Sequence, residues 1–131
     1  MGASPQFIAA PASDSIVIST ANLNYNGSGT IGTVFVAGAS GARVDVVSIC
    51  ATGTTAAGVV TLYVDDTGLG TNWRPMRFTV VTAIPTSATV PPFSIEQPFA
   101  GGYTLAPGAL IGASTTIAQG FAVSVRTGGD L

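Results

Sequence analysis

The stretch VVTLYVDDTGLGTNWRPMRFTV, residues 59–80, holds two apolar runs on either side of a segment rich in Asp, Gly and Asn. Each run alternates large apolar residues with other residues, which is typical of β-strands with one buried face. Glycine at positions 68 and 70 permits positive φ, and Asp and Asn side chains cap turns. The stretch therefore predicts an antiparallel hairpin that pairs residues 59–65 with residues 73–81.

The hydrophobic pattern also predicts the register of this hairpin. Placing Val60 opposite Phe78 and Leu62 opposite Met76 gathers the apolar side chains on one face. The same register leaves Arg77 in solvent, and a shift by one residue would bury it. We therefore expect Leu62 and Phe78 in the core.

The rest of the chain repeats this pattern. Short runs of Val, Ile and Thr are separated by clusters of Gly, Pro, Asn and Ser, which favours an all-β sandwich or barrel. The further expected strands are 16–20, 31–37, 43–52, 93–97, 110–114 and 121–126. About eight strands predict a single-domain antiparallel sandwich, jelly-roll-like, over residues 16–131. Residues 1–15 have no strand period and are expected to form an extended N-terminal arm.

The composition indicates assembly with other subunits. Only 8 % of the 131 residues are charged, 47 % are hydrophobic, and the formal net charge is -2. This balance argues against nucleic acid as a partner, because phosphate neutralisation needs a basic surface. No apolar run reaches the roughly 18 residues of a membrane span. Since a soluble surface normally carries many charges, we expect part of this surface to be buried in a homo-oligomer.

Two segments are candidates for such contacts. The strand at 43–52 is apolar on both faces, as in a strand covered on two sides, with Val44, Val46 and Cys50 predicted to share one of them. A small sandwich buries only one face of a strand in its own core, so the other face is free for a partner. The arm also contains an apolar pair. The candidate subunit or capsid contacts are Phe7, Ile8, Val44, Val46 and Cys50.

The residue types argue against catalysis and against cofactors. The chain has no histidine and no lysine, which excludes histidine-dependent triads and lysine Schiff bases within it. Asp65 and Asp66 are adjacent, so in an extended strand their carboxylates point to opposite sides. The calcium-loop template fails as well, because glycine and arginine stand at ligand positions, and no metal is expected. The alternative is a ligand platform, for example for a carbohydrate, formed by Tyr63, Asp65, Asp66 and Trp73.

Residues 18–66 resemble small proteins of tailed bacteriophages and prophages. The segments TVFVAGASGARVD (33–45) and ATGTTAAGVVTLYV (51–64) carry most of the likeness, with PTSATVPPF (85–93) and the ending VRTGGDL. The chain departs from that pattern in its longer DDTGLGTN turn. Val46 and Cys50 also stand where charged residues are expected.

The resemblance implies a virion structural protein, specifically a capsid decoration (cement) protein of a phage head that is made in the host bacterial cytoplasm. Its partner would be the major capsid protein. A trimer is favoured because an icosahedral shell offers threefold sites. The alternative function, from a different class, is a receptor- or carbohydrate-binding module of a phage tail or head fibre.

Overall fold

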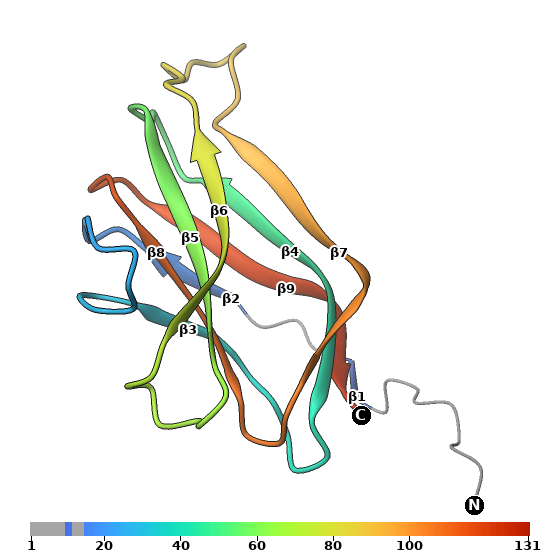
Figure 1. Cartoon of the computed structure of the whole chain (residues 1–131). Helices are drawn as coiled ribbons and strands as arrows, with labels where there is room; N and C mark the ends of the chain where they lie inside the picture. Colours follow the sequence, from blue (N-terminus) through green and yellow to red (C-terminus); the bar gives the residue numbers. More distant parts are fainter. Residues whose placement is uncertain (1–9, 12–14) are drawn as a thin grey trace, which may run out of the picture.

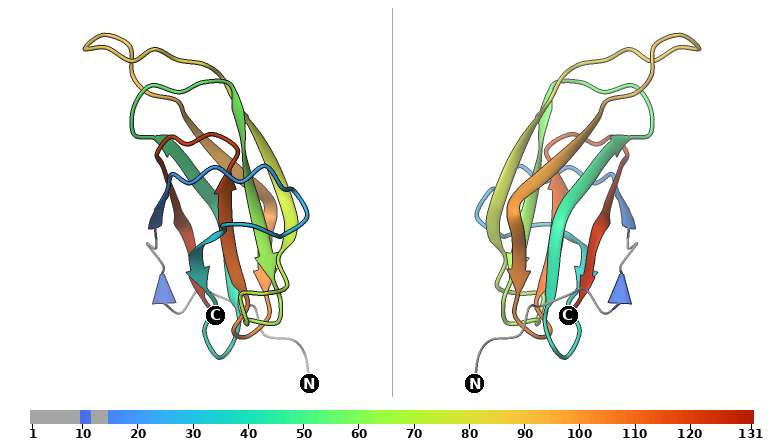
Figure 2. Two further views of the ribbon diagram at one scale, coloured as in Figure 1. Left: turned by 90° about the vertical axis from the view of Figure 1, so that its left-hand side faces the viewer. Right: turned by 90° about the vertical axis from the view of Figure 1, so that its right-hand side faces the viewer.

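A computed structural model describes residues 10, 11 and 15–131, and Figures 1 and 2 show two antiparallel sheets packed face to face. This described part of the chain contains nine strands and no helix. They are β1 (Ala10–Pro11), β2 (Ser15–Ile18), β3 (Gly32–Val36), β4 (Ala42–Ala51), β5 (Gly58–Asp65), β6 (Arg74–Val81), β7 (Ser94–Leu105), β8 (Leu110–Thr115) and β9 (Phe121–Asp130). The expected all-β sandwich is confirmed.

The order of the strands is that of a jelly roll. In the first sheet, called sheet A, β1 and β2 both pair with β9, which is followed by β4 and β7. In the second, sheet B, the order is β3-β8-β5-β6. From β2 onward the chain changes sheet at every connection except the β5–β6 hairpin. This arrangement leaves β2 and β3 at one edge of the sandwich and β6 and β7 at the opposite edge.

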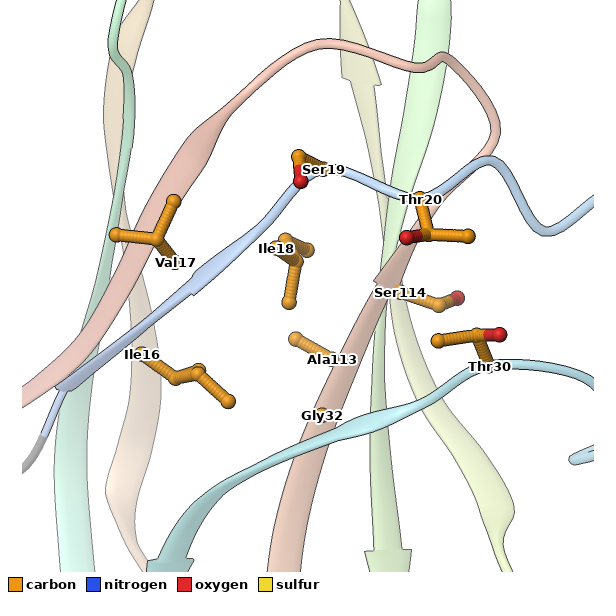
Figure 3. A pocket seen from close by; sticks show the side chains of 9 residues that line it. All are labelled: Ile16, Val17, Ile18, Ser19, Thr20, Thr30, Gly32, Ala113 and Ser114. Carbon is orange, nitrogen blue, oxygen red and sulfur yellow. The ribbon is translucent and has the colours of Figure 1, made fainter.

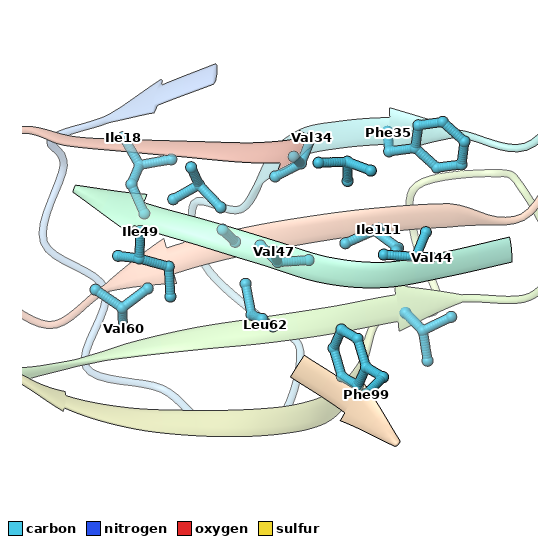
Figure 4. Packing of buried hydrophobic residues seen from close by; sticks show 14 of the residues in the cluster. Ile18, Val34, Phe35, Val44, Val47, Ile49, Val60, Leu62, Phe99 and Ile111 are labelled. Atoms are coloured by element: carbon cyan, nitrogen blue, oxygen red, sulfur yellow. The ribbon is translucent and has the colours of Figure 1, made fainter. Parts of the chain in front are cut away.

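The core lies between the two sheets and consists almost entirely of aliphatic side chains (Figure 4). The alternation of apolar residues in the sequence correctly predicts the core residues of β5 and β9 and of part of β4. In β5 and β9 the expected inward residues are all buried, and in β4 the C-terminal half follows the expected faces. These residues are Val60, Leu62, Val64, Phe121, Val123, Val125, Val47, Ile49 and Ala51.

The first correction concerns Val44, which was expected to contact another subunit or the capsid. Its side chain is 0 % exposed and belongs to the core, so it is not available for contact with another chain. The pairing of β4 with both neighbours shifts between Val44 and Val46, which marks a β-bulge. A bulge adds one residue and reverses the alternation. Val44 and Val47 therefore face the core together, whereas Val46 and Cys50 lie on the outer side.

The hairpin register is the second correction. The antiparallel pairing of β5 with β6 is confirmed, but Leu62 lies opposite Arg77 and Thr61 lies opposite Phe78. The pairing shifts after Leu62, so Met76 is an extra residue that reverses the faces of β6. As a result Phe78 is 54 % exposed on the outer face of sheet B.

Arg77 consequently occupies an inward position at the sandwich edge, where it is half-buried. Its Nη1 donates a hydrogen bond to Oε1 of Gln97 at 3.2 Å. The guanidinium carbon lies 5.1 Å from the centroid of the Phe99 ring. This position is tolerated because β6 and β7 are edge strands, so the charged group reaches the rim and contacts an aromatic face there.

Two strands are longer than expected, and one strand was missed. β7 continues through Pro98 and a bulge where Gly101 and Gly102 have positive φ. β9 continues through Gly128 and Gly129, and β1 adds a short pairing within the segment expected to be an arm. Glycine and proline weaken the strand signal, which explains why these extensions are absent from the prediction.

Candidate functional site

The turn between β5 and β6 is organised by Asp65, whose side chain is 0 % exposed. Its Oδ1 accepts hydrogen bonds from the backbone N–H and the hydroxyl of Thr67, at 2.9 and 2.5 Å. Its Oδ2 accepts one from the backbone N–H of Asn72 at 3.1 Å. Burial alone would raise the pKa of Asp65, but hydrogen bonds from Thr67, Asn72 and Gly70 lower it to about 2. Both carboxylate oxygens are thus used to fix the turn.

Asp66, the next residue, is exposed. Its negative charge acts instead on Tyr103, where burial and then the charge of Asp66 raise the pKa of the phenol. The two adjacent acids therefore have different surroundings, as expected for an extended chain. Within the described ranges, no three His, Cys, Asp or Glu residues gather into a group that could hold a metal ion.

Tyr63 and Trp73, together with Leu110 and Ile31, form a second, small hydrophobic cluster. It lies on the face of sheet B that points away from the main core, and it is buried there. Tyr63 is 0 % exposed and Trp73 is 7 % exposed. The Trp73 ring lies over Gly112, where an added Cβ would come within 2.8 Å of the ring. The expected ligand platform of Tyr63, Asp65, Asp66 and Trp73 is therefore wrong as an open site, since only Asp66 reaches solvent.

Residues 19–31, here called the cover loop, bury this cluster by crossing the outer face of sheet B. The backbone N–H of Asn22 donates to the carbonyl oxygen of Thr115 in β8 at 2.8 Å. The carbonyl oxygen of Asn24 accepts from the Tyr63 hydroxyl in β5 at 3.1 Å. The loop thus extends from β2 across β8 and β5, and Figure 2 shows it running over the sheet.

Asn22 closes the cover loop on itself, a role that no motif in the sequence indicates. Its side chain is 4 % exposed. Its Nδ2 donates to the carbonyl oxygens of Ser28 and Thr30 at 2.9 and 3.0 Å, and its Oδ1 accepts from the backbone N–H of Asn24 at 3.0 Å. An Asn inside a Gly-rich and Ser-rich segment is an ordinary turn residue, so only the packing reveals this role.

The cover loop and β6 together expose an apolar patch. The Tyr25 and Phe78 rings meet edge to face, with centroids 5.4 Å apart and planes at 84°. Leu23 precedes Tyr25 by two residues in the cover loop and is 76 % exposed, and Val80 follows Phe78 by two residues in β6 and is 72 % exposed. These four exposed hydrophobic residues of the cover loop and β6 are called the apolar patch. Such patches mark interaction surfaces more often than single exposed hydrophobic residues do.

The outer face of sheet A has a different character. Cys50 is exposed and Val46 is half-buried there, and the neighbouring positions of β4 carry small polar side chains such as Ser48. Nε of Arg43 forms an ion pair with Oδ1 of Asp45 at 2.9 Å on the same strand. Contact of Val46 and Cys50 with a partner stays a prediction. Phe7 and Ile8 lie outside the described residues.

Comparison with known proteins adds little. No protein-family model matches the chain, and no curated protein is similar enough to count as a relative. Two similar solved structures are described as the structures of the Gx and Gt strains of infectious bursal disease virus, with 14 % and 16 % identity and TM-scores of 0.29 and 0.28. They cover 96 % and 98 % of this chain, which in turn spans only 37 % and 36 % of theirs. At such TM-scores the likeness carries no argument about function.

No helix long and apolar enough to cross a membrane occurs in the part of the chain that the structure describes.

Proposed function

We propose that this chain is a bacteriophage head decoration protein, which binds the assembled major capsid protein and stabilises the shell. The observation that carries the proposal is the apolar patch of Leu23, Tyr25, Phe78 and Val80. It is built from a loop fixed to the sheet by Asn22 and Tyr63, so the patch is ordered before any partner arrives. The resemblance of residues 18–66 to small phage proteins indicates which partner to test.

The mechanism is mass action and requires no chemical step. A protein that binds only the assembled shell stabilises it by RT ln(1 + [L]/Kd), about 2.7 kcal/mol per site at a hundredfold excess over Kd. Repetition over the lattice multiplies this contribution. The same proposal includes a homo-oligomer, with a trimer favoured, and neither catalysis nor nucleic acid nor a membrane.

The fibre alternative is less well supported. It needs aromatic side chains open to a sugar, and Tyr63 and Trp73 are covered. The exposed pair of Tyr25 and Phe78 stands edge to face, an arrangement that does not present one flat platform. We therefore retain the head decoration protein as the proposed function.

Two measurements test the proposal. Quantitative mass spectrometry of purified virions should find hundreds of copies per particle, whereas a handful would indicate a fibre. Empty expanded heads mixed with the wild-type chain should bind it and melt at a higher temperature. The variant Val80→Asp, altered at an exposed position of the apolar patch, should lose this binding while keeping its own melting temperature within about 2 °C.

A further inference from the structure

Residues 82–93, TAIPTSATVPPF, form a loop between β6 and β7 that projects beyond the ends of both sheets (Figures 1 and 2). The segment contains no glycine, no charged residue and three prolines. Proline and the lack of glycine reduce the number of conformations open to a free loop. Connections in compact domains have a median length of about 4–6 residues, so this projecting loop is longer than the fold requires.

The base of the projecting loop is fastened to the segment before β5. Thr55 and Ile84 exchange backbone hydrogen bonds, both at 3.1 Å, and the Thr55 hydroxyl donates to the carbonyl oxygen of Thr82 at 2.8 Å. The Thr54 hydroxyl accepts from the backbone N–H of Thr86 at 3.1 Å. The loop therefore keeps its direction without help from a partner.

The tip is closed in the same way. The backbone N–H of Ser87 donates to the carbonyl oxygen of Val90 at 3.0 Å, and the reverse bond measures 3.3 Å. A tip already held in one conformation loses little entropy on binding, which favours affinity. The projecting loop thus has the properties of a preformed contact element.

The chemistry of the tip selects its partner. Residues 87–92, SATVPP, carry no charged, aromatic or amide side chain. They lack the cations that phosphate needs and the aromatic planes on which sugars and bases stack. Val90 is 40 % exposed and is the large apolar side chain of the tip. An uncharged protein surface with a hole for one aliphatic side chain fits this tip best.

The chain itself carries such a hole at its opposite edge. A cavity of about 210 Å³ opens between β2 and β3, as Figure 3 shows. Its walls are apolar and its rim is formed by hydroxyl groups, with no charged residue. The lining includes Ile16, Ile18, Gly32, Ala113, Thr20 and Thr30. The volume lies below the roughly 300–1,000 Å³ of small-molecule sites and leaves room for an aliphatic side chain.

We propose that the tip of the projecting loop of one copy inserts Val90 into the β2–β3 cavity of the next copy. The loop leaves the sandwich at the β6–β7 edge and the cavity lies at the β2–β3 edge, so each subunit presents both halves of the contact on opposite sides. Such a contact is heterologous and closes into a ring where the rotation permits. The inference rests on the self-association part of the proposed function and specifies its surfaces.

Sedimentation equilibrium of the full chain tests the contact. The wild-type chain should associate to a finite mass, and Val90→Asp or Thr30→Arg should each raise the dissociation constant at least about tenfold. Both positions are solvent-exposed in the single subunit, so neither change disturbs the core. The double variant places opposite charges in the contact and should associate more tightly than either single variant. The matched control is Val80→Asp, which adds the same charge on the apolar patch and should leave the mass unchanged.

A second experiment tests the direction of the contact. In a Cys50→Ser background, chains with Val90→Cys and chains with Thr30→Cys should form a disulfide-linked pair when mixed with oxidised glutathione, which takes up the two electrons and two protons released by the thiols, and neither variant should link to itself. A wild-type chain that stays monomeric up to about 100 µM would overturn the proposal, since a Kd above that corresponds to a binding free energy weaker than about 5.5 kcal/mol. The proposal would also be overturned if Val80→Asp dissociated the oligomer and Val90→Asp had no effect on it. Head binding by Val80→Asp is measured separately, so failure of the decoration function is distinguishable from failure of this contact.

Discussion

The adjacent acids Asp65 and Asp66 allow a controlled test of how the β5–β6 turn is held. Asp65→Asn and Asp66→Asn make the same chemical change and remove the same charge, one residue apart. In Asp65→Asn the amide oxygen can still accept from Thr67, but the amide NH₂ then faces the backbone N–H of Asn72, which it cannot bind. A buried donor without a partner costs about 1–3 kcal/mol. Asp66→Asn lies at an exposed position and should stay within about 0.5 kcal/mol.

Thermal melting followed by circular dichroism measures the difference. For a domain of this length, Asp65→Asn should lower Tm by about 3–12 °C and Asp66→Asn by about 2 °C or less. The pH dependence gives a second readout. The folded pKa of Asp65 is about 2, below its usual range, so its ionised form favours folding. Its contribution is complete above the unfolded pKa, about 3.9, and is lost as the pH falls towards 2.

The gap in Tm between wild type and Asp65→Asn should therefore narrow between pH 5 and pH 2. Comparison of the two chains removes the contributions of other acids. Equal effects of the two substitutions, or a gap that does not change over this range, would refute the account of the turn. A rise of Tm with calcium that disappears in Asp66→Asn would show that the loop binds a cation, against the expectation from the sequence.

Four further substitutions test the packing, each by urea or thermal unfolding. Leu62→Ala should destabilise the fold by about 2–5 kcal/mol because Leu62 is 0 % exposed, whereas Phe78→Ala should cost less than about 1.5 kcal/mol; similar values would contradict the observed register. Asn22→Ala should cost about 1–3 kcal/mol and speed amide exchange in the cover loop, and unchanged exchange would show that other contacts hold the loop. Thr79→Val should be neutral or stabilising by up to about 1 kcal/mol, because Oγ1 of Thr79 is buried without a hydrogen-bond partner in the described chain; a clear loss of stability would reveal a partner for this hydroxyl.

The architecture follows from the sequence because the signals that determine it are local. Alternation over 59–65 and 121–125 identifies strands and their buried faces, and Gly, Asn and Pro clusters mark where the strands end. The number and spacing of strands then leave few all-β arrangements. What alternation does not show is a bulge, because the extra residue changes no composition. The errors at Val44 and Phe78 both come from this cause.

The contact surfaces could be predicted only in outline. The low charge indicated association, and the structure offers apolar surface for it. The position of that surface depends on long-range packing, however. Tyr25 meets Phe78 across 53 residues of chain only because the cover loop crosses sheet B, and Trp73 is hidden by the same crossing. No spacing in the sequence indicates such a crossing, so the two aromatic residues first chosen for a ligand platform, Tyr63 and Trp73, are those that the loop conceals.

The two proposed surfaces are compatible because they lie on different sides of the subunit. The projecting loop and the β2–β3 cavity lie at opposite edges of the sandwich, whereas the apolar patch lies on the outer face of sheet B. A ring closed through the edges does not use the apolar patch for its own contacts. A capsid surface that engages one patch then brings the others of the ring close to their own sites, and each further contact is effectively intramolecular. Weak binding by a single patch is enough for firm attachment of the ring, so Val90→Asp should weaken head binding indirectly, although it leaves the patch intact.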